Sequence, residues 1–187
     1  MTVQAVHASR ARLLRINRLG LWLFILSESM LFLGILAARF FLRGTFVPEE
    51  ADQNIALVIT VILLASSWTA YRAEAAATEG DAAGLQRFLM YTILLGLAFV
   101  VGVGFEWREG FHAFPPTSPF GTVFFTMTGL HAFHVITGLL FFWIVSIGAR
   151  RGRYSAEDHW PVEAAVKYWH FVDVVWVFFY PALYLVG

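Results

Sequence analysis

Five ionisable side chains stand inside long apolar stretches of this 187-residue chain, and their types and spacing set the chemistry open to it. They are Glu28, His131, His134, His170 and Asp173. A charge surrounded by hydrocarbon is costly unless a neighbour pairs with it, so residues of this kind need polar partners. Carboxyls and imidazoles in such places can exchange protons, ligate a metal or join helices by hydrogen bonds.

Glu28 lies about ten residues into its apolar stretch, ~15 Å along a helix and close to the middle of a bilayer. We expect a lone carboxyl at this depth to be neutral or hydrogen-bonded. Two interpretations stay open, a structural carboxyl or lipid-headgroup contact on one side and a proton-exchanging group on the other. The candidate partners are serines, at Ser27, Ser29, Ser66 and Ser67.

His131 and His134 are three residues apart and therefore project from one face of a helix. Two imidazoles so placed could ligate a metal, but a catalytic metal usually needs three protein ligands. His134 lies ~20 Å into its stretch, and His170 and Asp173 lie ~9–13 Å into theirs. If the two helices are antiparallel, these three groups share a layer, which favours interhelical hydrogen bonds over metal ligation.

Three further acidic residues fall at the ends of the apolar stretches. They are Glu79, Asp81 and Glu106, and we expect solvated interfacial charges at these positions. The last stretch also places a row of polar or amphipathic side chains on one helical face, which should turn toward the bundle or a partner. This row consists of His170, Asp173, Trp176, Tyr180 and Tyr184.

The composition indicates an integral membrane protein, because 59% of the residues are hydrophobic and 14% are charged. The formal net charge is zero, which excludes the basic surface that nucleic-acid binding requires. Cysteine is absent, which excludes disulfides, iron–sulfur clusters and thiolate-ligated copper.

The apolar pattern predicts an all-α bundle of five transmembrane helices in a single domain, residues 19–187. Turn and breaker residues bound spans of about 19–42, 54–78, 88–106, 120–149 and 164–186. A basic segment, residues 1–18, precedes them, and it reads equally well as an interfacial helix or as a partly ordered tail. Of the 13 Lys and Arg residues, ten fall on one side and three on the other. This asymmetry predicts a cytoplasmic N-terminus and a C-terminus outside.

The chain carries neither a phosphate-binding loop nor a nucleophile with its base. Scattered polar groups in five helices make a poor stand-alone enzyme, so we expect an accessory subunit without catalytic residues. A proton-coupled transporter using Glu28 and Asp173 is a remote alternative, since neither inverted repeats nor broken helices are evident.

Four motifs resemble subunit III of the haem–copper oxidases in its short bacterial form. The stretch LWLFILSESMLFLGILAARFF resembles the family helix with a buried glutamate, at Glu28. The other three are EGDAAGLQRFLMYTILLGLAF, FFTMTGLHAFHVITG and YWHFVDVVWVFFY, in the family's order. Fuller members have seven spans, and this chain resembles the last five.

The resemblance implies a non-redox subunit of a cytochrome c oxidase, which passes electrons from cytochrome c to dioxygen and pumps protons. In this family the haems and copper belong to partner subunits I and II, so we expect neither metal nor haem in this chain. Bound phospholipid, support of proton uptake, a place in the bacterial inner membrane and contacts within a respiratory supercomplex are further expectations. A proline near the end, Pro181, also resembles subunits of nitric oxide reductases, and quinol oxidases have a similar subunit.

Overall fold

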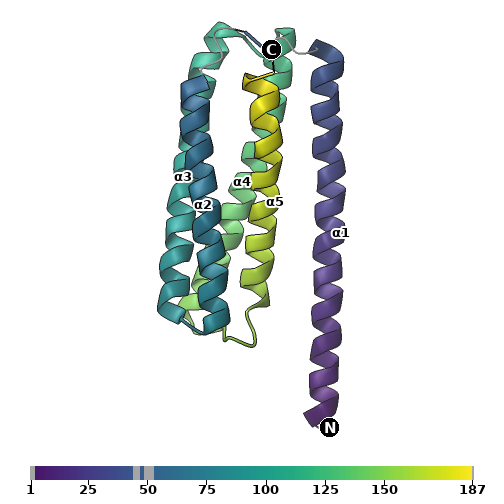
Figure 1. Ribbon diagram of the computed structural model, residues 1–187, viewed down its shortest axis with the longest axis vertical. Coiled ribbons are helices and arrows are strands. Elements are labelled where there is room, and N and C mark those ends of the chain that lie inside the picture. The colour runs from purple at the N-terminus through teal and green to yellow at the C-terminus, as the bar shows by residue number, and fades with distance from the viewer. Residues whose placement is uncertain (1–2, 44–46, 49–52, 187) are drawn as a thin grey trace.

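The computed structural model describes residues 3–43, 47–48 and 53–186, with the side chains of residues 11–42, 47–48 and 53–186. This part of the chain forms five α-helices and no β-strand, apart from one isolated bridge between Ser155 and Asp158 (Figure 1). The expected all-helical fold is confirmed. The helices are α1 (Val3–Arg43), α2 (Gln53–Glu79), α3 (Ala82–Ala113), α4 (Pro119–Arg150) and α5 (Trp160–Tyr184).

Short polar side chains start two of these helices. The carboxylate of Asp81 accepts a hydrogen bond from the backbone N–H of Gly84 at 2.8 Å, and this N-cap begins α3. The hydroxyl of Ser118 accepts one from the N–H of Gly121 at 3.0 Å and begins α4. Each cap satisfies a helix N–H that would otherwise lack a partner. The turn between α2 and α3 is tight because Gly80 adopts a φ of +75°.

Helices α1 to α4 extend past the predicted apolar spans, most clearly α3, which begins before residue 88 and ends after residue 106. Helix α5 begins before its predicted start at 164 but ends at Tyr184, two residues short of the predicted end. A span is recognised from its apolar residues, whereas a helix continues into the interface as long as its residues tolerate helical geometry. The basic segment 1–18, left open above, belongs from Val3 onward to the same continuous helix as the first span.

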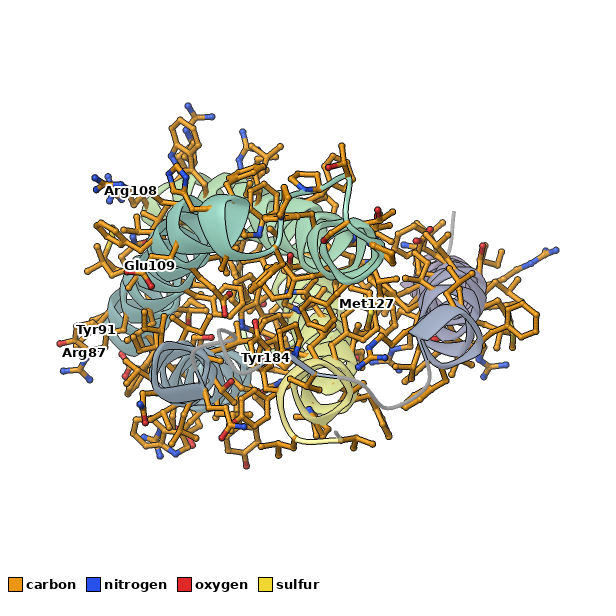
Figure 2. The ribbon with its side chains drawn as sticks, turned by 90° about the horizontal axis from the view of Figure 1, so that it is seen from above. Arg87, Tyr91, Arg108, Glu109, Met127 and Tyr184 are labelled. Carbon is orange, nitrogen blue, oxygen red and sulfur yellow. The ribbon has the colours of Figure 1, made fainter. Side chains whose placement is uncertain are left out.

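Helices α2, α3, α4 and α5 form a closed ring, in which each helix packs against two others. Helix α1 stands outside this ring against α5 and α4, and its N-terminal end projects beyond the other helices (Figure 1). Seen from above, Met127 and Tyr184 point into the interior, whereas Arg87, Tyr91 and Arg108 project from α3 at the periphery (Figure 2). The core of the ring is aromatic, with Phe99, Phe124, Phe142, Trp169 and Trp176 fully buried.

Four helices in the described part of the chain are long and apolar enough to cross a membrane, namely α1 (from Ala11 to Leu42), α2, α3 and α4. Many of their large apolar side chains face outward, including Leu23, Val61, Leu97 and Ile144. This chain is therefore a multi-pass membrane protein. Helix α5, which carries Lys167, His170 and Asp173, is not among these four helices, so its crossing stays a prediction, as does the orientation of the termini.

Candidate functional site: polar contacts between the helices

Glu28 of α1 meets His134 of α4. The Nε2 atom of His134 lies 3.2 Å from Oε2 of Glu28, and the two side chains are 7% and 21% exposed. Phe32, one turn further along α1, packs edge-on against the same imidazole at 4.8 Å between ring centroids. The predicted serine partners bond elsewhere: Ser29 and Ser66 donate to carbonyls of their own helices.

The backbone determines how protons are shared in this pair. The Nδ1 atom of His134 lies 2.8 Å from the carbonyl oxygen of Leu130, and a carbonyl only accepts, so Nδ1 carries a hydrogen. A bond between Nε2 and Glu28 then needs one more proton, carried either by the carboxyl or by the imidazole. A hydrogen bond between Glu28 and His134 therefore requires one proton shared between the two facing atoms.

His131 turns to a different helix from His134, although both belong to α4. Its Nε2 atom donates to the carbonyl oxygen of Val172 in α5 at 3.2 Å, and the ring is fully buried against Phe99 and Trp176. Within the described residues, no three His, Cys, Asp or Glu side chains form a group that could hold a metal ion. The absence of a metal from the chain stays a prediction.

His170 and Asp173 face α2, away from His134. The Nδ1 atom of His170 lies 2.8 Å from the hydroxyl of Ser67 and 3.9 Å from Oδ2 of Asp173. His170 and Asp173 therefore do not form the expected polar layer with His134, because they lie on the opposite side of α5 from it. Residues 170 and 173 lie on the α5 face toward α2, whereas Tyr168 lies on the face toward α4 and donates its hydroxyl to the carbonyl of His134 at 3.1 Å.

A line of hydrogen bonds joins the N-terminal half of α2 to α5 from Trp169 to Tyr184. Following α5 toward its C-terminal end, it consists of Trp169 Nε1 to Ser66 Oγ (3.0 Å), Ser67 with His170 (2.8 Å), Trp176 Nε1 to Thr60 Oγ1 (2.9 Å) and Gln53 Nε2 to the carbonyl of Tyr184 (2.7 Å). Of the predicted polar row on α5, His170 and Trp176 take part in this helix–helix seam through their side chains and Tyr184 through its carbonyl oxygen, as expected for polar groups in lipid. The roles of Thr60 and Trp169 in this seam were not predicted from the sequence. For Thr60, the sequence shows only a hydroxyl residue within an apolar run, which does not identify its partner.

Replacing Trp176 with Phe is expected to weaken this seam moderately. The ring contacts are largely retained, but Thr60 loses a donor, and interhelical hydrogen bonds in bilayers contribute ~0.6 kcal/mol on average. Unfolding of the purified chain in mixed micelles of increasing SDS content measures the change. Trp143→Phe is the matched control, because Trp143 is 62% exposed on α4. Equal effects from both substitutions would contradict the role of the hydrogen bond.

The three predicted interfacial carboxylates have different environments. Asp81 caps α3 and Glu79 is exposed, as a solvated charge should be. Glu106 differs from the expectation, since it is 5% exposed and accepts a hydrogen bond from the hydroxyl of Tyr184 at 2.5 Å. The end of α5 covers this carboxyl, and such a contact between distant residues cannot be inferred from position along the chain.

Charged residues near the C-terminal end of α2 and the N-terminal end of α5 pair with one another and with Arg18 of α1, and these pairs were not predicted from the sequence. Arg18 pairs with Glu163 at 3.0 Å, and Lys167 pairs with Glu163 at 2.8 Å and with Glu74 at 3.5 Å. Together with Glu28 and His134, the Arg18–Glu163 pair holds α1 against the ring at a second level. Only the spacing of Glu163 and Lys167, one helical turn apart, was visible in the sequence.

Comparisons with known proteins agree with this arrangement. Residues 2–187 match the family model described as cytochrome c oxidase subunit III. The probable cytochrome c oxidase subunit 3 of Nocardia farcinica is 34% identical over 175 residues, which cover 89% of this chain and 86% of the relative. The cytochrome c oxidase subunit 3 of Synechocystis is 36% identical over 89% of this chain and 74% of its own length. The subunit 3 of Thermostichus vulcanus is 35% identical, over 89% and 86%. The chain therefore belongs to the cytochrome c oxidase subunit III family.

Proposed function

We propose that this chain is the non-redox accessory subunit of a respiratory cytochrome c oxidase in the bacterial inner membrane. The family match over residues 2–187 carries the proposal. In this role the chain binds the catalytic subunit I and subunit II, which hold the haems and copper. The complex passes electrons from cytochrome c to dioxygen and pumps protons.

The polar contacts support an accessory role. Each of the five membrane-depth residues lies beside another helix: Glu28 at α4, His131 and His134 at α5 and α1, and His170 with Asp173 at α2. The Glu28–His134 pair holds a proton that a neighbouring subunit's uptake path could exchange. Its partial exposure, 21% at the Glu28 side chain, leaves it open to such a neighbour.

Bound phospholipid is part of the proposal. A cavity of about 480 Å³ lies between α1 and the ring, lined by Leu21 and Phe24 of α1, Phe141 and Ile144 of α4, and Tyr168 of α5. Its lining is almost wholly apolar, which suits an acyl chain. A lipid here would fill the space that α1 leaves because it packs on only two helices.

Purification of the tagged chain in mild detergent tests the proposed function. We expect a multi-haem subunit and a copper-binding subunit to co-purify, and we expect the chain separated from them to show no Soret absorption. The copper-binding subunit distinguishes a cytochrome c oxidase from a quinol oxidase or nitric oxide reductase, because it is the entry site for electrons from cytochrome c. Stoichiometric haem or copper on the separated chain, or purification without these subunits, would contradict the proposal.

A further inference from the structure

His170 is the most exposed of the five membrane-depth residues. Its side chain is 38% exposed, against 21% for Glu28, 7% for His134 and 5% for Asp173, and His131 is fully buried. Its depth follows from its partner Ser67, which lies near the middle of the 27-residue helix α2. A half-exposed imidazole at this depth is costly when hydrocarbon is its only surrounding.

The neighbours of His170 determine which ring nitrogen faces outward. Both carboxyl oxygens of Asp173 are buried, and among the described residues the side chains of His170 and Ser67 are the polar groups that face them. The nearest ring nitrogen is Nδ1 of His170, which also faces the hydroxyl oxygen of Ser67. Placing the hydrogen on Nδ1 serves these acceptors and leaves Nε2 with a lone pair. In the described part of the chain, Nε2 has no hydrogen-bond partner, so in this tautomer it accepts a hydrogen bond only from a donor outside the chain.

The surface around Nε2 has the form of a helix-binding face. His170, Val174 and Val177 form an outward strip on α5, which lies between α1 and α2 (Figure 1). Beside the strip is a cavity of about 220 Å³, lined by Phe32 and Leu36 of α1 and by Val174 and Phe178 of α5 among others. Apolar side chains fit this cavity, but lipid tails have no hydrogen to donate to Nε2.

We propose that a transmembrane helix of another protein packs on the strip formed by His170, Val174 and Val177 and donates a hydrogen bond to Nε2 of His170. The donor is a hydroxyl, amide, indole or guanidinium side chain, and apolar neighbours on the same helix enter the adjacent cavity. This inference rests on the proposed function only in placing the chain within a membrane complex. Failure to isolate an oxidase would overturn the proposed function. Whether another protein contacts His170, Val174 and Val177 is a separate result, and it tests only the proposal about this strip.

Photo-cross-linking in intact membranes tests the contact directly. The probe p-benzoylphenylalanine is placed at Val177 or, as a control, at Leu97 of α3, and these positions are 49% and 48% exposed. We expect the Val177 probe to cross-link to a transmembrane segment of a different protein, identified by mass spectrometry, and the Leu97 probe to label mainly lipid. Cross-links from Val177 only to lipid, or only to a second copy of this chain, would overturn the proposal.

Two substitutions of His170 test the roles of its two ring nitrogens separately. The amide of Gln reaches about as far as Nε2 and that of Asn only as far as Nδ1, so Gln keeps an outward acceptor and Asn keeps the contact with Ser67. We expect His170→Asn to weaken association about 3- to 20-fold, the effect of losing one interhelical hydrogen bond in a bilayer, and His170→Gln to restore it. The yield of the Val177 cross-link, divided by the amount of folded chain, is the readout. Equal yields from the Asn and Gln variants would overturn the role of Nε2.

Discussion

Replacing Gly138 with alanine is expected to leave the chain about 1–3 kcal/mol less stable than the same replacement at the open position Gly104, and this difference is the usual cost of overpacking a core. A Cβ atom at Gly138 would lie 2.7 Å from Cε3 and 2.9 Å from Cζ3 of Trp169. That indole cannot move aside easily. Its Nε1 atom donates to Ser66, and a Cβ built on Gly96, across the ring on α3, would lie 2.8 Å from Cη2. Trp169 is thus held between two helices that approach closely only because both positions are glycine.

Unfolding of the purified chain in mixed micelles measures this loss. Gly104→Ala is the matched control, since a Cβ at Gly104 meets nothing within 4 Å. Both substitutions gain the same intrinsic helix preference of alanine, about 1 kcal/mol, so their difference isolates the collision with Trp169. If the Gly138 and Gly104 variants are equally stable, the close packing around Trp169 is contradicted.

The second large effect is expected at the Glu28–His134 pair. Glu28→Leu and His134→Leu each leave one polar group at membrane depth without its partner, so each should destabilise the chain. The double variant should lose less than the sum of the two, with a coupling energy of ~0.6–1.7 kcal/mol. Unfolding of the wild type, the two single variants and the double variant in mixed micelles gives the four free energies of this double-mutant cycle. Strict additivity would show that the 3.2 Å contact makes no net contribution.

Glu28→Gln separates stability from proton exchange at the same pair. The amide keeps a hydrogen bond to His134 but cannot take up the shared proton, so we expect the subunit to stay in the complex while sustained turnover or long-term stability of the complex falls. The lifetime of oxygen consumption by the purified complex is the measurement. Ser27→Ala, one residue away on an exposed position, is the control. A turnover lifetime and subunit retention equal to wild type would argue against a functional role for the carboxyl.

The helices and their membrane character could be predicted from the sequence because both depend on local properties. Apolar runs long enough for a bilayer, separated by residues such as Gly80 and Ser118 that turn or cap the chain, determine five helices whatever their neighbours are. Helix α5 is the instructive case. Its polar row was predicted from the sequence, but α5 is not among the four helices that are long and apolar enough to cross a membrane. The four family motifs likewise depend only on the order of residues along the chain.

The partners of the polar residues were decided by the tertiary structure alone. Counting residues along a helix gives the depth of a side chain, and depth placed His134, His170 and Asp173 at one level. It does not give the rotation of each helix or its lateral neighbours. Tyr168 and Trp169, packed against α4 and between Gly96 and Gly138, orient α5 so that His170 meets Ser67 while His134 is left to Glu28. Rotation and lateral position arise from packing among helices, and a single sequence does not contain those distances.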